Sequence, residues 1–343
     1  MELSKQDTTA IKGIAILLML WHHLFLSTVE YGVWANSFAS IAKLCVALFL
    51  FVSGYGLTKQ YSKLEKPHFK NTVKFLVLRY LKFFFPYWFC FAIIVAVGNA
   101  FGYGFADAYP SSRNTLKCFL LDVWGQMGYA SYLPTWWFNK MILQLYLVFP
   151  LLYLLVRNRY VALAALAAVF VMQPNALQLP GNVFFVVEGG LPAFFVGMMM
   201  AKHQWLPQPD GKATRIVAGV VAAVLCLGLA VWHQSGIGVY YAILIRAAMA
   251  VSVAYLFSLT SGWMTPLQYV GQLATTMYLL HTLFLKLIPN VVYVPRFPIL
   301  VFLWFLAFSL AGAIFIARLQ KWARYDKLQN VVLDKVERMF GLL

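Results

Sequence analysis

Charged side chains are scarce in this sequence, and acidic side chains are scarcer than basic ones. The 343 residues include 27 lysines and arginines but only 11 aspartates and glutamates, whereas 62% of the residues are hydrophobic. About a quarter of the residues of an ordinary soluble domain are charged, so this composition excludes that class. Apolar stretches of about 20 residues recur along the chain, and we therefore predict a helical membrane protein.

Cysteine is also scarce, with four residues in the whole chain. Three of them, Cys45, Cys90 and Cys226, fall within apolar stretches, and Cys118 lies in a predicted loop. Their spacing is typical neither of a disulfide framework nor of a metal site. We therefore expect no disulfide scaffold and no bound metal.

The net charge of +16 does not indicate a nucleic-acid-binding protein, because the cations lie in short connections between apolar stretches. Cytoplasmic loops of membrane proteins are enriched in Lys and Arg, which contact anionic lipid headgroups. We therefore expect the lipid bilayer as a partner and no nucleic acid; the oligomeric state is left open.

The apolar stretches predict an all-α, polytopic membrane protein whose helices surround a central cavity. The ten predicted spans are residues 10–29, 37–57, 80–101, 135–156, 159–173, 183–201, 215–232, 239–259, 267–288 and 298–319. Lys and Arg concentrate in alternate connections, which predicts that both termini are cytoplasmic. We divide the chain into a ten-span domain, residues 1–320, and a cytoplasmic amphipathic tail, residues 321–343.

Residues 103–134 form a long predicted loop on the extracytoplasmic side. An apolar stretch, residues 118–121, lies among its polar residues, and this pattern predicts a helix at the membrane interface. Loops of this length are more often functional than short ones.

The first span carries a cation and a histidine on one face. Glu2 and Asp7 precede an apolar stretch that is too long for a cleavable signal peptide, so we expect the span to be retained. Lys12 and His23 are eleven residues apart, which returns to nearly the same helix face and separates them by roughly 16 Å. His22 points roughly 100° away, and we interpret it as a structural residue.

Ionisable side chains at bilayer depth are costly, so each needs a partner, water or a function. Lys140 and Glu188 share a level, where their pairing would either hold two helices together or line an outward-facing vestibule with Arg246. His281 lies close to the predicted level of His23, where it either belongs to a site or forms an interhelical hydrogen bond.

The predicted cytoplasmic side is cationic. Lys12, Arg79 and Lys82 lie at the inner ends of the first and third spans. They would either hold a polyanion or anchor the protein to headgroups, and these residues alone do not separate the two interpretations.

Five stretches in fixed order carry a family resemblance: Lys12-Gly13 with His23, Leu48 to Tyr55 (LFLFVSGY), Arg79 to Trp88 (RYLKFFFPYW), Trp136 to Leu147 (WWFNKMILQLYL) and Gly271 to His281 (GQLATTMYLLH). Together they resemble the motifs of acyltransferase family 3, integral membrane proteins that move acyl groups, usually acetyl, onto extracytoplasmic glycans and related acceptors. Lys12 stands where the family usually has Arg, so a bidentate phosphate contact would become a point charge.

The resemblance implies a membrane O-acetyltransferase of the bacterial cytoplasmic membrane. Its donor would be cytoplasmic acetyl-CoA or another acyl-CoA, and its acceptor an extracytoplasmic glycan or lipid-linked sugar. His23 would act as general base or transient acyl carrier, oriented by Glu188 or His281. Tyr278 and Gln144 would donate to the thioester oxyanion. The expected site is thus catalytic His23, Glu188 and His281, donor-binding Lys12, Arg79 and Lys82, and substrate-binding Lys140, Gln144, Arg246 and Tyr278.

Two other classes stay open. A transporter or flippase of an anionic solute would bind it with Lys140, Glu188 and Arg246 and use the histidines as a proton relay. That class gives no reason for His23 to share a face with inner cations. A non-catalytic membrane scaffold explains the buried charges least well.

Overall fold

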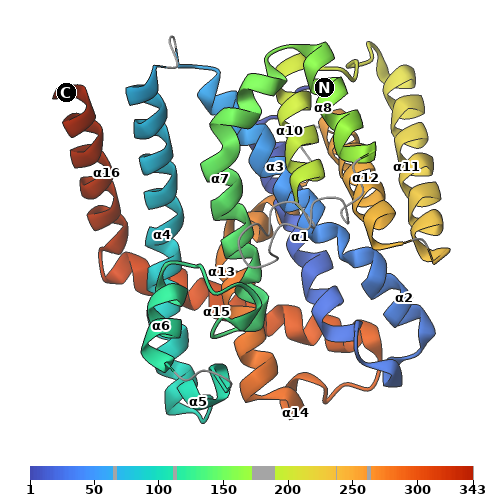
Figure 1. Cartoon of the computed structure of the whole chain (residues 1–343). Helices are drawn as coiled ribbons and strands as arrows, with labels where there is room; N and C mark the ends of the chain where they lie inside the picture. The colour runs from blue at the N-terminus through green and yellow to red at the C-terminus, as the bar shows by residue number, and fades with distance from the viewer. Residues whose placement is uncertain (65–67, 111–113, 172–189, 237, 261–263, 343) are drawn as a thin grey trace. The chain divides into compact units, whose positions relative to one another are not determined.

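The computed structural model shown in Figure 1 describes the chain except residues 65–67, 111–113, 172–189, 237, 261–263 and 343. The described residues form α-helices, short 3₁₀ turns and their connections, with no strand among them. The prediction of an all-α protein is therefore confirmed.

The chain divides into two compact units, and the division falls within two helices, α7 (Trp137–Val156) and α13 (Thr265–Leu287). Unit 1 comprises Met1–Lys63 and Phe149–Ala274, and unit 2 comprises Leu64–Val148 and Thr275–Leu343. The other helices of unit 1 are α1 (Lys5–Phe25), η1 (Val29–Tyr31), α2 (Val33–Ala42), α3 (Leu44–Tyr61), α8 (Arg159–Val171), α10 (Leu191–His203), α11 (Lys212–Gln234) and α12 (Val239–Leu259). Those of unit 2 are α4 (Phe69–Ala100), α5 (Phe105–Ala108), α6 (Thr115–Val123), η2 (Gly128–Ala130), η3 (Pro134–Trp136), α14 (Pro289–Val292), α15 (Pro298–Trp322) and α16 (Tyr325–Leu342).

Helices long and apolar enough to cross a membrane occur at seven places among the described residues: Lys5–Phe25, Val33–Tyr61, Phe69–Ala100, Pro134–Val156, Lys212–Gln234, Tyr241–Leu259 and Pro298–Trp322. Each coincides with a predicted span. Of the three remaining predictions, 159–173 corresponds to the 13-residue α8, and 183–201 lies partly outside the described residues. The third, 267–288, corresponds to α13, which is long enough at 23 residues but more polar. The count of ten stays a prediction.

Two helix boundaries differ from the prediction. α4 begins at Phe69, eleven residues before the predicted start of its span at 80, because the polar residues ahead of the apolar stretch continue the helix. The span predicted at 37–57 begins at Val33 and is interrupted at Lys43, so that it consists of α2 and α3. At the interruption the Val46 N–H bonds to the Lys43 carbonyl, three residues back, rather than four as in an α-helix.

The start of α1 follows from its sequence. The Ser4 hydroxyl accepts the Asp7 N–H at 3.1 Å, and the Asp7 carboxylate accepts the Ser4 N–H at 2.8 Å. This reciprocal pair is a capping box, which satisfies two of the N–H groups that a helix start leaves without partners. From Lys5 onward α1 continues without a break to Phe25.

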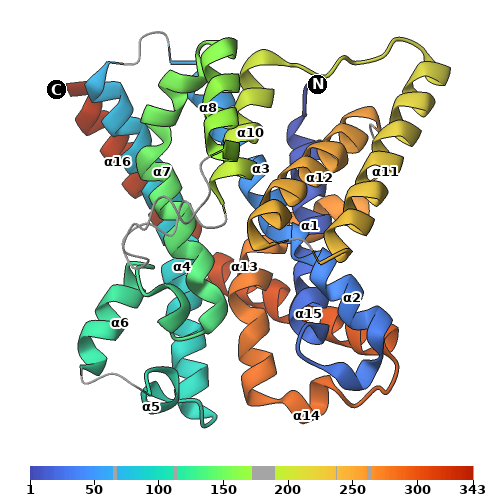
Figure 2. The same ribbon diagram turned by 45° about the vertical axis from the view of Figure 1, so that its right-hand side comes forward.

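Glycines bring the helices of unit 1 into close contact. A Cβ atom at Gly54 of α3 would overlap the Phe194 carbonyl of α10, and one at Gly197 of α10 would overlap the Phe51 carbonyl. A second pair, Gly13 and Gly271, does the same for α1 and the first part of α13, against the carbonyls of Leu267 and Thr9. Small residues allow such backbone approach in membrane proteins, where packing rather than the hydrophobic effect holds helices together. Figure 2 shows α12 running beside α11 in the same unit.

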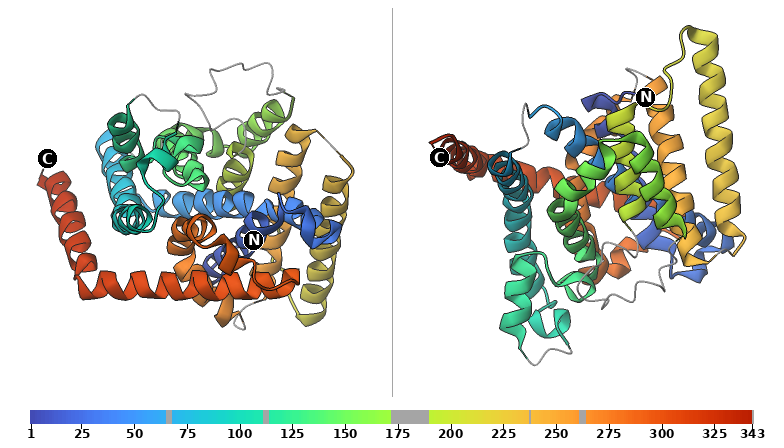
Figure 3. Two further views of the ribbon diagram at one scale, coloured as in Figure 1. Left: turned by 90° about the horizontal axis from the view of Figure 1, so that it is seen from below. Right: turned by 45° about the horizontal axis from the view of Figure 1, so that its top comes forward.

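Aromatic side chains form much of the core of unit 2. Trp136 contacts Tyr87, Phe91 and Tyr132, and its Nε1–H donates to the Leu279 carbonyl of α13 at 3.0 Å. Figure 3 shows α16 leaving α15 at a sharp turn. At this turn Arg324 adopts a φ of 53°, which few residues other than glycine adopt. α16 then packs against α4, where Lys74 and Glu337 approach to 3.4 Å.

Candidate functional site

The two adjacent histidines of α1 have different surroundings. His22 is buried, and its Nδ1 lies 2.7 Å from the carbonyl oxygen of Ala39 in α2. Because a carbonyl only accepts, Nδ1 carries the proton of this bond and His22 links α1 to α2. His23 is half-buried and meets the His22 ring edge-on at 5.1 Å. The structural interpretation of His22 is thereby supported, and His23 remains the candidate for chemistry.

Lys12 and His23 lie on one uninterrupted helix, so their predicted separation of roughly 16 Å holds for α1. Lys12 is exposed and precedes Gly13, one of the residues at which α1 closely approaches α13. Unit 1 therefore contains both residues on one continuous helix, and their common face stays a prediction.

Arg79 of α4 contacts α7 within unit 2. Its Nη2 donates to the Tyr146 hydroxyl at 2.6 Å, and its guanidinium lies 4.6 Å from the centre of the Tyr146 ring. The neighbouring Tyr80 donates to the Leu143 carbonyl at 2.7 Å. The buried Arg79 Nε forms no hydrogen bond. Tyr146 thus holds the Arg79 guanidinium in place, while its Nε–H stays available to an anion. Lys82 follows on the same helix and is exposed.

His281 of α13 is fully buried in a hydrogen-bonded chain. Its Nδ1 lies 2.7 Å from the Tyr278 carbonyl, which requires a proton on Nδ1, so Nε2 accepts from the Thr282 hydroxyl at 3.1 Å. The Thr282 hydroxyl also lies 2.7 Å from that of Thr135. Tyr278 in turn donates its hydroxyl proton to the Thr135 carbonyl at 3.0 Å. This network joins α13 to η3, the turn that precedes α7, so His281 and Tyr278 both have a structural role.

The remaining predicted residues are spread over the chain. Lys140 and Gln144 are half-buried side chains of α7 in unit 2. Arg246 belongs to α12 in unit 1, and Glu188 lies outside the described residues. Unit 1 thus contains Lys12, His23 and Arg246, whereas unit 2 contains Arg79, Lys82, Lys140, Gln144, Tyr278 and His281. That these two sets form one site stays a prediction.

Arg246 has neighbours that the sequence did not indicate. Lys43, His22 and His233 each interact with it electrostatically. These four basic groups come from α1, the junction of α2 and α3, α11 and α12. The sequence signal was weak, because His233 lies just beyond the predicted end of its span, where basic residues usually contact headgroups. Lys43 lies inside the predicted span 37–57, and nothing in the sequence pairs it with Arg246.

Asp122 of α6 is a second feature that the sequence did not indicate. It is fully buried, and its Oδ2 accepts the Tyr109 hydroxyl at 2.9 Å and the Tyr132 N–H, whereas its Oδ1 accepts no hydrogen bond. Burial raises the pKa of Asp122 to about 6, against the opposing effect of the groups that donate to it. Burial and the neighbouring carboxyl raise the pKa of Tyr109 as well. A carboxyl with this pKa titrates in a physiological range.

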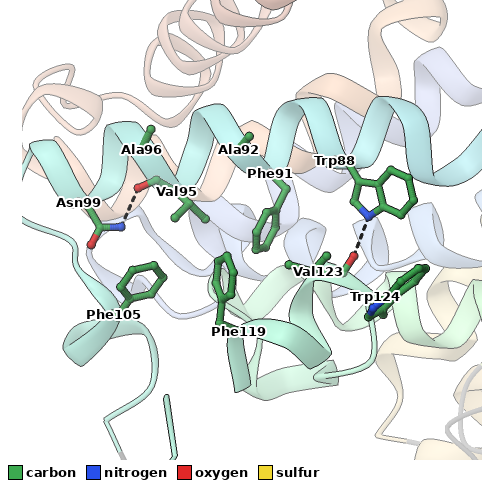
Figure 4. A pocket seen from close by; sticks show the side chains of 10 residues that line it. All are labelled: Trp88, Phe91, Ala92, Val95, Ala96, Asn99, Phe105, Phe119, Val123 and Trp124. Carbon is green, nitrogen blue, oxygen red and sulfur yellow. Dashed lines mark hydrogen bonds between the residues drawn. The ribbon is translucent and has the colours of Figure 1, made fainter. Parts of the chain in front are cut away.

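The predicted helix of the long loop exists as α6, and it packs against α4. Figure 4 shows an open groove between α4, α5 and α6, with a volume of about 620 Å³. Its lining is almost entirely apolar and includes Phe91, Phe105 and Phe119. At one end the Trp88 indole N–H donates to the Val123 carbonyl at 2.9 Å, which holds α6 against α4.

In the part of the chain that the structure describes, no three His, Cys, Asp or Glu residues come together as a metal site would require.

The membrane-length helices of both units define a multi-pass helical membrane protein. Residues 8–318 match the family model described as an acyltransferase domain. The chain therefore belongs to acyltransferase family 3, a family of membrane acyltransferases, as its motifs predict. Neither the curated proteins nor the solved structures give a match.

Proposed function

We propose that the protein transfers an acyl group, acetyl above all, from cytoplasmic acyl-CoA to a hydroxyl of an extracytoplasmic glycan or lipid-linked sugar. The observation that carries the proposal is the family match over residues 8–318, combined with an α1 that bears Lys12 and His23 on one continuous helix. The family membership favours this class over the transporter. The bacterial cytoplasmic membrane is the proposed location.

The donor binds through its phosphates at the inner cations. Arg79 is suited to this role, because Tyr146 fixes its guanidinium through one Nη2 bond and leaves Nε available. Arg presents several N–H donors to a phosphate in fixed geometry, whereas Lys12 and Lys82 add charge without directionality.

His23 carries out the transfer. Its neutral imidazole takes the proton from the acceptor hydroxyl, the alkoxide oxygen attacks the thioester carbonyl, and the carbon–sulfur bond breaks. The imidazolium returns the proton to the departing CoA thiolate. In the second form of the mechanism the imidazole attacks the thioester itself, and the acyl-histidine then passes the group to the hydroxyl. Both forms give the same products, an ester and free CoA.

Other side chains orient and bind. Glu188 or His281 orients the imidazole, and Gln144 or Tyr278 donates to the thioester oxyanion. For Tyr278 this requires exchange of its bond to the Thr135 carbonyl, and for His281 exchange of its bond to the Tyr278 carbonyl or the Thr282 hydroxyl. Lys140 and Arg246 bind the acceptor.

The experiment is an orientation-controlled liposome assay with labelled acetyl-CoA inside and candidate glycan acceptors outside. Label on an external acceptor supports acyl transfer, whereas transport of an unmodified anionic solute would support the transporter. His23→Ala should abolish transfer while membrane insertion stays intact. His22→Gln is the matched control, because it changes the adjacent histidine, whose Nδ1 bonds to Ala39; it should retain measurable turnover. Full turnover by His23→Ala would refute the role of His23.

A further inference from the structure

We propose that Lys43, His233 and Arg246 form a binding site for a phosphate-type oxyanion. The three side chains come from different helices of unit 1 and interact electrostatically with one another. The site is defined by interactions within unit 1. It shares Arg246 with the acceptor binding proposed above, but its phosphate binding is measured without acyl transfer.

Two hydrogen bonds to α2 set the frame of the site. The Gln234 amide at the end of α11 donates to the Ser37 carbonyl at 2.7 Å, which fixes the position of His233 next to it. His22 of α1 bonds to the Ala39 carbonyl at 2.7 Å. Lys43 follows directly after α2, and α12 packs against α1, α3, α10 and α11. Arg246 is therefore held beside the same end of α2.

His233 and Arg246 have hydrogen-bonding groups that a bound anion would satisfy. Both ring nitrogens of His233 are buried and form no hydrogen bond. Arg246 donates through Nε to the Ala242 carbonyl of its own helix at 2.9 Å, which leaves its terminal N–H groups for another acceptor. A half-buried histidine whose ring nitrogens form no hydrogen bond and a half-buried guanidinium are the groups that an oxyanion would bind.

The electrostatic neighbours of these groups point to a negative ligand. Among the described residues they are one another, His22 and the Cys45 thiol, and they include no carboxylate. Like charges in a poorly hydrated environment disfavour one another, and an anion between them removes the repulsion. Donors that converge from three helices fit a tetrahedral anion with several oxygens better than a planar carboxylate, which one Arg satisfies. The ligand is either the phosphate of a lipid headgroup or a soluble phosphate compound.

The experiment measures phosphate binding through thermal stability. The full chain in a neutral detergent is titrated with inorganic phosphate, with chloride at equal ionic strength as reference, and separately with phosphatidylglycerol. A ligand that binds the folded state raises Tm in a saturable way. Lys43→Gln/Arg246→Gln should weaken phosphate binding and raise the half-saturating phosphate concentration by at least about tenfold. Lys212→Gln/Arg215→Gln is the control, since it removes the same charge at the opposite end of α11.

Each outcome decides the proposal. A saturable rise with inorganic phosphate that the cluster variant loses and the control keeps supports a site for soluble phosphate compounds. The same pattern with phosphatidylglycerol alone supports a headgroup site. A rise that is equal in all variants, or no rise with either probe, overturns the proposal. Phosphate binding that is detected only in Glu188→Gln would also overturn the proposal, because a carboxylate of the chain itself would then neutralise the cluster. His233→Gln, a milder change, gives the same test if the double variant does not fold.

Discussion

Asp122 shows how strongly surroundings change one side chain. A carboxyl ordinarily has a pKa near 3.8, and burial in the core of unit 2 raises that of Asp122 to about 6. Its donors are the Tyr109 hydroxyl and the Tyr132 N–H, both in the loop that α6 belongs to. The protonation state of Asp122 is therefore coupled to the packing of this loop.

The first prediction concerns the pH dependence of stability. Well below the ordinary pKa of 3.8 the Asp122 carboxyl is protonated in both the folded and the unfolded chain. Between the ordinary pKa of 3.8 and about 6 the unfolded chain releases this proton while the folded chain retains it, so folding stability falls as pH rises. The loss is complete above about pH 6 and amounts to about 3 kcal/mol at most.

Asp122→Asn removes the titration, because an amide does not ionise. Melting curves of the purified protein between pH 4 and 7 should show Tm falling for the unmodified chain and staying nearly level for the variant. The control is Asp107→Asn, which changes an exposed carboxylate that accepts the Gly104 N–H in the same loop. Identical pH profiles for the unmodified chain and Asp122→Asn would contradict the assignment.

A second prediction at this scale concerns Arg79 and the donor. Arg79→Lys keeps the charge but removes the guanidinium that Tyr146 holds through a bond of 2.6 Å. Loss of one or two charge-assisted hydrogen bonds to phosphate should raise KM for acyl-CoA by about 10- to 100-fold. The value of kcat should change little, since the reacting carbonyl is bound elsewhere.

Steady-state kinetics in detergent with varied acyl-CoA measure both constants. Tyr146→Phe should show a smaller rise in KM, because it retains the ring under the guanidinium and loses only the hydroxyl. A fall in kcat at unchanged KM in Arg79→Lys would indicate that Arg79 does not bind the donor.

At the scale of helices, glycine spacing determines which helices can touch. Gly54 and Gly197 each approach a backbone carbonyl of the opposing helix, so the backbones of α3 and α10 meet directly at these two residues. Gly56 lies two residues after Gly54 on the same helix, but a Cβ there would meet nothing within 4 Å. The two glycines therefore differ in surroundings while sharing helix and residue type.

Gly54→Ala should destabilise the protein by about 1–3 kcal/mol, because the added methyl forces the two backbones apart. Gly56→Ala should be neutral or stabilise it by up to about 1 kcal/mol through helix propensity. Thermal unfolding in detergent, followed by tryptophan fluorescence, compares the two variants with the unmodified chain. Equal Tm values for both alanine variants would show that α3 and α10 are not in close contact.

Helices were easier to predict than contacts. Apolar length predicts the spans at seven of ten positions, since the hydrophobic match to a bilayer is a property of one segment. The interruption at Lys43 and the early start of α4 were missed, because apolar length reports neither a local change of hydrogen bonding nor a helix that continues into polar residues. Asp122 is buried by contacts from the segments that contain Tyr109 and Tyr132. The hydrophobic periodicity of α6 alone does not predict these contacts. His22 was predictable because its angle from His23 follows from α1 alone.

At the scale of the whole molecule, the number of spans fixes the sides of the termini. Ten spans place both ends of the chain on one side of the membrane, whereas an odd number places them on opposite sides. Seven described helices are membrane-length and apolar, and α8, α10 and α13 lie at the positions of the other three predicted spans without meeting that criterion. Lys and Arg in alternate connections predict that both ends are cytoplasmic.

Cysteine labelling measures this parity. The natural cysteines, Cys45, Cys90, Cys118 and Cys226, are replaced by alanine or serine, and single cysteines are introduced at Glu2, Ala106 and Gly341, which are all exposed. In intact cells a membrane-impermeant maleimide should label Ala106→Cys and leave Glu2→Cys and Gly341→Cys unlabelled until the membrane is permeabilised. Labelling of one terminus alone in intact cells would require an odd number of spans. Such a result would place either Lys12 or the C-terminal end of the chain on the extracytoplasmic side, which the proposed transfer does not allow. The labelling therefore tests the topology and the direction of acyl transfer together.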